Sequence, residues 1–367
     1  MILGDHLPNP LTGVKTTASE RHRQIVELGV RGEALGFDSV WLGEHHLCDY
    51  ILSSPPVVLA AIAERKTRVR LGTAVTLLGS LDPVRAAEDY ATLDVLSNGR
   101  AEVVAGRGVL RRTYSDFGLD PGLSRELFEE NVACLLAAWS GEPAHLEARH
   151  RPSLRGVTVH PRPQQRPHPP LWIHASAAPA ATEWIGGGSS FESVDLAARL
   201  GLPLMLPSVL AAPPAFVPFV ARYRERFVAN GLGRERPRVG ACSHVHVAAD
   251  SQTARVRWRP HHLSYLTWVT TVLMPWGGVN IGFTPRAGAT QAPAAPPPQP
   301  PDFDALCRGP SICGSPGEVA DRIASMRELL GLELHLAMFD HGGIPEDALA
   351  DSLELFAAHV IPQVTAI

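Results

Sequence analysis

Residues 35–46, LGFDSVWLGEHH, show the unit from which the chain is built. A helical stretch stops at Gly36, a residue that is free to adopt positive φ. The apolar run over residues 37–42 then predicts a buried strand. Glu44, His45 and His46 follow that run directly. The segment therefore predicts a helix end, a strand, and titratable side chains at the carboxyl end of the strand.

The same alternation of apolar run, turn and helical stretch recurs along the chain. The runs cover residues 2–7, 37–42, 69–75, 101–105, 171–175, 202–206, 238–248 and 332–339. Helices are expected over about 19–35, 55–65, 83–96, 124–139, 191–200, 215–229, 316–330 and 346–360, with a helical or mixed stretch at 251–273. Eight strands alternating with helices indicate an α/β fold, and their number suits a closed (β/α)₈ TIM barrel. The competing doubly wound sheet needs a glycine fingerprint after the first strand, which residues 4–8 do not provide.

A single domain over residues 1–367 is expected, with two insertions and one unusual loop. The insertions lie at about 141–170, which is rich in Pro, His and Arg and suggests a hairpin, and at about 176–188. The loop at about 285–303 contains a proline run that excludes a helix or an interior strand. It is expected to be a mobile surface loop between the seventh and eighth strands, where it could also cover an active site.

Composition narrows the class of protein. The 367 residues are 45% apolar and 19% charged, and the formal charge of −4 leaves no basic excess for a nucleic-acid backbone. No apolar run approaches the roughly 20 residues of a membrane span, and residues 1–6 lack the layout of a signal peptide. Five scattered cysteines form no C-x-x-C pair. We therefore expect a cytoplasmic protein without a nucleic-acid or membrane partner.

The Glu44-His45-His46 segment is the first candidate for chemistry. The carboxyl ends of barrel strands carry the reacting groups of barrel enzymes, and a histidine there can transfer protons near neutral pH. A metal site is a rival interpretation. However, adjacent residues of an extended chain point to opposite sides, so His45 and His46 would converge poorly on one ion, and no metal is predicted. Alternatively, one of these histidines only fills a polar gap at the barrel mouth.

Two further segments could bind an anion. Residues 97–100, Ser-Asn-Gly-Arg, form a turn that leads through the fourth strand to Gly106-Arg107-Gly108. Glycine lets the backbone approach a ligand closely, and the arginine fork matches phosphate. Residues 186–193 are a glycine run followed by Ser189, Ser190 and Ser193 at a helix start, which suits an anion or ordinary N-capping. Together with Arg107 they favour a shared phosphate site.

Taken together, these segments resemble the bacterial luciferase-like monooxygenase family. The matching stretches are residues 35–46, 82–89, 93–100 and 106–108, with weaker matches at 193–203 and 354–362. The resemblance implies a (β/α)₈ barrel that binds reduced FMN or, in some branches, the deazaflavin F420. Members of the family either activate O₂ or transfer a hydride.

The resemblance also implies roles for individual residues. His45 matches the catalytic histidine, with Glu44 and His46 beside it, and Thr73 and Ala74 match residues behind the flavin ring, sometimes through a non-proline cis peptide. Gly106 stands where true luciferases have a reactive cysteine, so bioluminescence is not implied. The phosphate would be held by Arg107, its flanking Gly108, Arg125, Ser189, Ser190 and Ser193, or by Ser176 in place of the later serines because of the insertion at 176–188.

The function implied is that of a monooxygenase that uses reduced FMN and O₂ to oxygenate a hydrophobic organic substrate, such as a polyketide or other secondary metabolite. A separate flavin reductase would supply the reduced flavin, and a homodimer would form through helices 55–65 and 83–96. Residues 274–301 would close a dry pocket. The alternatives are an F420-dependent hydride-transfer enzyme, a non-catalytic flavin-binding barrel and, more distantly, a metal-dependent hydrolase.

Overall fold

The computed structural model describes residues 1–108, 110–175, 191–209, 211–232, 236–273 and 302–365. Within these ranges, eight parallel strands pair in a closed ring, in which each strand bonds to two neighbours. In ring order they are β1 (Ile2–Leu3), β2 (Ser39–Leu42), β3 (Arg70–Thr76), β4 (Ala101–Ala105), β7 (Leu171–His174), β8 (Leu204–Leu206), β9 (Val239–Val247) and β11 (Leu334–Met338). The ring closes where Ile2 pairs with Met338 on one side and Trp41 on the other. The predicted (β/α)₈ barrel is therefore confirmed.

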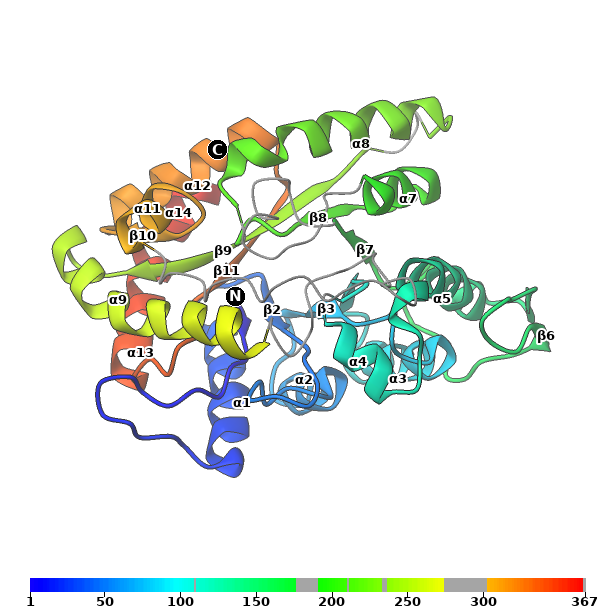
Figure 1. Cartoon of the computed structure of the whole chain (residues 1–367), viewed down its shortest axis with the longest axis horizontal. Coiled ribbons are helices and arrows are strands. Elements are labelled where there is room, and N and C mark those ends of the chain that lie inside the picture. Colours follow the sequence, from blue (N-terminus) through cyan, green and yellow to red (C-terminus); the bar gives the residue numbers. More distant parts are fainter. Residues whose placement is uncertain (109, 176–190, 210, 233–235, 274–301, 366–367) are drawn as a thin grey trace, which may run out of the picture.

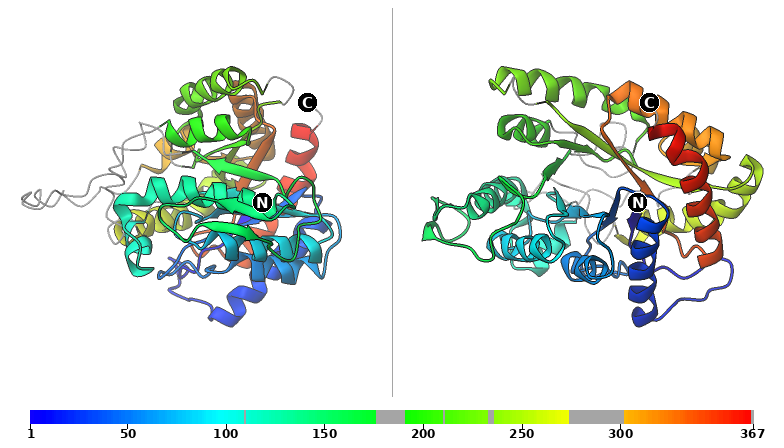
Figure 2. Two further views of the ribbon diagram at one scale, coloured as in Figure 1. Left: turned by 90° about the vertical axis from the view of Figure 1, so that its right-hand side faces the viewer. Right: turned by 180° about the vertical axis from the view of Figure 1, so that it is seen from behind.

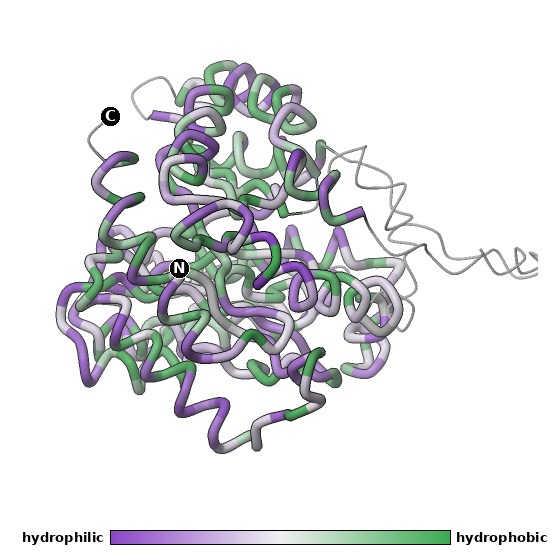
Figure 3. Tube along the Cα trace, turned by 90° about the vertical axis from the view of Figure 1, so that its left-hand side faces the viewer, coloured by the Kyte–Doolittle hydropathy of each residue, from purple (hydrophilic) through white to green (hydrophobic). Residues whose placement is uncertain are grey.

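Helices surround the strands (Figure 1). In chain order the main ones are α1 (Ala18–Ala34), α2 (Pro55–Ala63), α3 (Pro83–Leu96), α5 (Ser124–Trp139), α7 (Glu192–Leu200), α8 (Val217–Ala229), α9 (Ser251–Trp268), α12 (Pro316–Leu330) and α13 (Glu346–Leu355). Hydrophilic and hydrophobic residues alternate along the outer helices (Figure 3), as expected when one face packs on the core. None of the helices in the described ranges is both long and apolar enough to cross a bilayer.

The helix boundaries follow local signals in the sequence. At α3, the Asp82 side chain accepts hydrogen bonds from two backbone N–H groups, and Pro83 occupies the first turn. At α12, Ser315 and Glu318 form a reciprocal capping box. Gly36, just past the end of α1, has a φ of +85°, as predicted for the residue that stops this helix.

Several smaller elements were not predicted from the sequence. They are α4 (Arg111–Asp116), η1 (Pro121–Leu123), η2 (Pro213–Phe216), α11 (Phe303–Arg308), β10 (Ile312–Gly314), which pairs with β9, and α14 (Ile361–Thr365). Two π-helical turns follow α9 and α13 directly: η3 (Val269–Leu273) and η4 (Phe356–Val360). The first strand is also shorter than its apolar run. The unpredicted helices and β10 are three to six residues long, too short to show a periodicity in the sequence.

Within the segment 141–170, β5 (Ala144–Leu146) and β6 (Leu154–Val157) form an antiparallel hairpin. It projects from one end of the molecule (Figures 1 and 2) and packs on α5 through Cys134, Ala144 and Leu154. The second insertion, at 176–188, lies outside the described residues, as does most of the proline-rich loop. The end of that loop is corrected: Asp302 caps α11, so the helix begins at Phe303.

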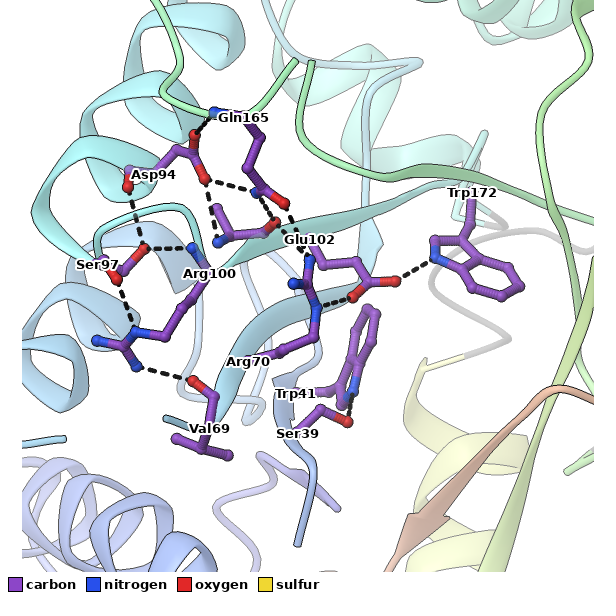
Figure 4. A network of polar contacts seen from close by, with 11 residues as sticks. Ser39, Trp41, Val69, Arg70, Asp94, Ser97, Arg100, Glu102, Gln165 and Trp172 are labelled. Carbon is purple, nitrogen blue, oxygen red and sulfur yellow. Dashed lines mark hydrogen bonds and ion pairs between the residues drawn. The ribbon is translucent and has the colours of Figure 1, made fainter. Parts of the chain in front are cut away.

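The barrel interior is a packed core at the level of the strands. Six buried side chains from five strands fill it: Trp41, Val104, Trp172, Met205, Leu336 and Met338. Gly72 leaves room for this packing, because a Cβ at that position would collide with the Trp41 ring. Trp172 Nε1 donates to Glu102 Oε1 at 2.6 Å, and Arg70 Nε donates to Glu102 Oε2 at 2.7 Å (Figure 4). The barrel is therefore not a pore, and any ligand must bind at its mouth.

A buried polar network holds the amino end of β4. The fully buried Asp94 carboxylate accepts a hydrogen bond from the backbone N–H of Gln164 at 2.8 Å. It also accepts from the backbone N–H (2.9 Å) and the Nε2 (2.6 Å) of Gln165 (Figure 4). Arg100 donates to the Val69 carbonyl at 2.8 Å. The 97–100 turn is therefore a structural element at the edge of the barrel opposite Arg107, and not part of an anion site.

Replacing Asp94 by Ala should lower the free energy of unfolding by about 3–5 kcal/mol, because buried donors lose their charged acceptor. Urea unfolding at neutral pH measures the change. Asp89→Ala is the matched control, because Asp89 is exposed on the same helix and forms its ion pair within the described residues with the exposed Arg85, so its loss should cost about 0–1 kcal/mol. Equal unfolding midpoints for the two variants would refute the structural role of Asp94.

Candidate functional site

Glu44 joins the carboxyl ends of β2 and β3. It is buried, and its Oε2 accepts a hydrogen bond from the Leu77 backbone N–H at 3.2 Å. Its Oε1 lies 2.7 Å from His46 Nε2, and since a carboxylate only accepts, this ring nitrogen carries the proton. The His46 ring also packs against Phe117, with centroids 5.0 Å apart. Glu44 and His46 therefore hold each other in place. These contacts do not direct either side chain toward His45.

His45 is the titratable group without such a partner. Its ring makes no hydrogen bond to any residue in the described part of the chain, and its Nδ1 is buried and unpartnered. The ring packs edge-to-face on Tyr50, with centroids 4.7 Å apart. Burial lowers the pKa of His45 to about 4, so the imidazole is neutral at pH 7. A neutral imidazole with a free nitrogen can hold or pass on a proton.

Strand β3 presents Ala74 and Val75 to the barrel interior. Both contact the interior cluster around Trp41 and Trp172, and the peptide bond between them is cis. Thr73 differs, because its buried hydroxyl lies 2.6 Å from Thr76 Oγ1 and accepts from the Tyr90 hydroxyl at 3.1 Å. A cofactor placed over this strand would therefore meet Ala74 and Val75, whereas the Thr73 side chain is engaged by α3.

Gly106 lies at the end of β4, against the irregular part of β3. Its N–H donates to the Thr76 carbonyl at 2.9 Å, and a Cβ at this position would lie 2.7 Å from Val75 Cγ2. A cysteine here would force Val75 to move. Glycine at position 106 is thus required by the close approach of the two strands.

Arg107 is the candidate anion-binding residue with the clearest geometry. Its guanidinium makes no hydrogen bond or ion pair with the residues that the structure describes, although it is half-buried and burial lowers its pKa. The backbone is held in place, because the Arg107 carbonyl accepts from the Tyr114 hydroxyl and Gly108 turns with a φ of +80°. A half-buried cation without a carboxylate partner suits an anionic ligand.

Arg125 and the start of α7 adjoin Arg107. Arg125 forms an ion pair with Glu192, the first residue of α7, and its charge acts on Arg107 closely enough to lower the pKa of Arg107 further. Ser193, the second residue of α7, is buried. The structure therefore brings Arg107, Arg125 and the first residue of α7, Glu192, to one place. Ser176, Ser189 and Ser190 lie outside the described residues, and their roles stay predictions.

The structure also contains a buried histidine cluster, His244, His262 and His341, that was not predicted as a candidate site. The rings of His244, His262 and His341 lie 4.7–5.2 Å apart between centroids. The signal was present in β9, where alternation puts His244 on the same side as Gly240 and Cys242, which face the interior tryptophan and methionine side chains.

Hydrogen bonds and burial define the state of this cluster. His262 Nδ1 lies 3.0 Å from His341 Nε2, and His262 Nε2 lies 2.8 Å from Ser311 Oγ. Burial lowers the pKa of His244 to about 3, so this ring is neutral. Tyr265, which contacts the same interior cluster as Ala74, lies 5.0 Å from the His341 ring. The cluster is therefore built from β9, α9 and the segment after β11, and its His244 ring is neutral.

A family model described as luciferase-like monooxygenase matches residues 6–333. The alkanal monooxygenase alpha chain of Photorhabdus luminescens is 30% identical over 200 residues, which are 52% of this chain and 50% of that protein. The chain thus aligns with about half the length of the curated relatives that it matches.

Solved structures align over almost the whole chain. Monooxygenase RslO1 from Streptomyces bottropensis superposes with a TM-score of 0.77 at 25% identity, covering 99% of both chains. The oxygenating constituent of 3,6-diketocamphane monooxygenase from Pseudomonas putida, solved with FMN, gives 0.72 at 17% identity over 99% of both. An F420-dependent secondary alcohol dehydrogenase gives 0.69 at 18% identity over 94% of this chain and 95% of that one. The last two likenesses show the fold alone.

Proposed function

Because the chain belongs to the luciferase-like monooxygenase family, we propose that it is a flavin-dependent monooxygenase that uses reduced FMN and O₂ to oxygenate a hydrophobic organic substrate. One observation carries the proposal. The half-buried Arg107 guanidinium, unpaired among the described residues, lies at the same barrel edge as the neutral His45 imidazole. This edge can hold a phosphate at one point and transfer a proton at another.

The residues present fit a flavin nucleotide. Arg107 and the N-terminus of α7 would hold its phosphate, with Arg125 adjoining through Glu192. Gly106 and Gly108 allow the backbone to come close to it, and the ring system would lie against Ala74 and Val75. Reduced FMN, when bound, supplies the two electrons and the position at which O₂ is activated.

The chain itself would orient the substrate, exclude water and transfer a proton. His45 would act as the general acid or base, since its partly buried imidazole is neutral and its Nδ1 has no partner among the described residues. Glu44 would fix the backbone end of β3 through Leu77. The apolar floor formed by Trp41 and Trp172 would exclude water and receive a hydrophobic, preferably aromatic, substrate such as a polyketide or other secondary metabolite.

The partners belong to the same proposal. A separate flavin reductase would supply the reduced flavin in the cytoplasm. A homodimer would form through α2 and α3, which expose apolar side chains: Val57 is 68% exposed, Leu96 49% and Val95 46%. The mass of the protein in solution tests the dimer, and charged substitution of Val57 should dissociate it.

Binding and isotope incorporation test the function. Purified protein should bind FMN more tightly than F420. Supplied with reduced FMN and ¹⁸O₂, it should introduce one ¹⁸O atom into a member of a panel of aldehydes, ketones and aromatics. Tighter binding of F420, with hydride transfer to or from a substrate, would replace the proposal by the F420-dependent alternative. Flavin binding with no turnover of any panel member would favour a flavin-binding barrel.

A further inference from the structure

Tyr50 is inserted at the barrel mouth beside His45. The chain leaves β2 at Leu42, passes through residues 43–49 and returns so that the Tyr50 ring stands at 86° to the His45 ring, 4.7 Å away between centroids. Tyr50 is only 5% exposed, and the backbone N–H of His45 donates to the Leu52 carbonyl at 3.2 Å. The loop is thus folded back against the residue from which it departs.

Glycines at the ends of two neighbouring strands leave the space that this ring occupies. A Cβ on Gly43, at the end of β2, would lie 2.9 Å from Tyr50 Cζ and collide with the hydroxyl. A Cβ on Gly4, at the end of β1, would lie 2.7 Å from the same Cζ and also collide with the hydroxyl. Gly43 has no left-handed φ that would itself demand glycine. Space for Tyr50 therefore accounts for the glycine at position 43.

The surroundings keep the phenol neutral. Burial raises the pKa of Tyr50, and the charged groups near it are Asp5, Asp340 and Arg21, with Tyr265 facing it from α9. Arg21 Nη2 lies 2.7 Å from Asp340 and 3.9 Å from Asp5, so this cation is already paired. On the other side of His45, the titratable neighbour is His46, which is bonded to Glu44.

We propose that Tyr50 is a positioning residue for His45: its aromatic ring, admitted by Gly43 and Gly4, holds the imidazole at the barrel mouth and shields it from water. The imidazole has no hydrogen-bonding partner of its own within the described structure, so the Tyr50 ring is the aromatic contact that restrains it. The meaning of this contact for catalysis rests on the proposed function. Its effect on His45 does not.

The direct test is an NMR titration of the His45 imidazole in flavin-free protein, with its signal assigned by its loss in His45→Ala. In the wild type, His45 should titrate well below the ordinary pKa of about 6.5. Tyr50→Ala opens the imidazole to water and should raise its pKa by about one unit or more. Tyr50→Phe keeps the ring and should leave the pKa within about 0.3 unit of the wild type.

Substitution of Gly43 provides an independent test. Gly43→Ala displaces the ring without removing it and should raise the pKa of His45 as Tyr50→Ala does. Gly317→Ala is the control, because a Cβ at Gly317 meets no atom within 4 Å. In a Tyr50→Ala background Gly43→Ala should have no further effect, since nothing remains to displace. An unchanged pKa in Tyr50→Ala, or additive effects of the two substitutions, would overturn the proposal.

Turnover separates this inference from the proposed function. If the wild type oxygenates a substrate, Tyr50→Ala should lower kcat about tenfold or more with little change in KM or FMN affinity, and Tyr50→Phe should restore most of it. An active wild type whose kcat is unaffected by Tyr50→Ala would overturn the positioning role. If the wild type oxygenates nothing, the proposed function fails, while the titration still decides whether Tyr50 positions His45.

Discussion

Replacing His45 by Ala should lower turnover about 100-fold or more, the range that a general acid or base contributes. FMN affinity should change little, because the residues that would hold the phosphate lie at the ends of β4 and α7 and not at His45. The reason for the large loss is that Glu44 and His46 are bonded to each other, so neither is free to take over the proton transfer. Single-turnover rates with reduced FMN and an accepted substrate measure the effect.

A matched control separates this role from general damage. His145→Ala removes an exposed histidine of the β5–β6 hairpin and should leave both turnover and FMN binding unchanged. Full activity of His45→Ala would show that His45 carries no essential proton. Parallel loss of activity and FMN binding would show instead that His45 supports the cofactor.

Replacing Arg107 by Ala should weaken FMN binding about 10- to 100-fold. A hydrogen bond to a charged group contributes about 1.5–3 kcal/mol, and about 1.4 kcal/mol corresponds to a factor of ten. Riboflavin, which lacks the phosphate, should bind the wild type and this variant equally well. Fluorescence titration with the two ligands measures both affinities on the same samples.

The control for Arg107 is Arg85→Ala. Arg85 is exposed on α3 and paired with Glu88 and Asp89, so its removal should leave both affinities unchanged. A loss of riboflavin affinity equal to the loss of FMN affinity in Arg107→Ala would mean that Arg107 supports the pocket rather than the phosphate. No loss of either would place the phosphate elsewhere.

The sequence predicted the barrel because its signals are local. Helices α3, α5 and α12 begin and end where caps, prolines and apolar periodicity indicated. The histidine cluster could not be predicted in the same way. His244, His262 and His341 are far apart in the chain and meet only because β9, α9 and the segment after β11 converge.

The sequence predicted where the candidate site lies and which residues are near it, but not the contacts between these residues. Position after β2 indicated His45, yet its free imidazole, and the engagement of His46 by Glu44, appear only in three dimensions. The sequence of the 97–100 turn could not be distinguished from that of a ligand-binding loop, because glycine is favoured in both. The need for glycine at position 43 is explained only by the Tyr50 ring, which is seven residues away in the chain.

A crystal structure of the protein with FMN bound would show where the phosphate and the ring system lie. We predict the phosphate within hydrogen-bonding distance of the Arg107 guanidinium and the N-terminus of α7, with the ring system against Ala74 and Val75 and beside His45. FMN bound at another place, or a phosphate held far from Arg107 with His45 facing away from the ring, would contradict the account.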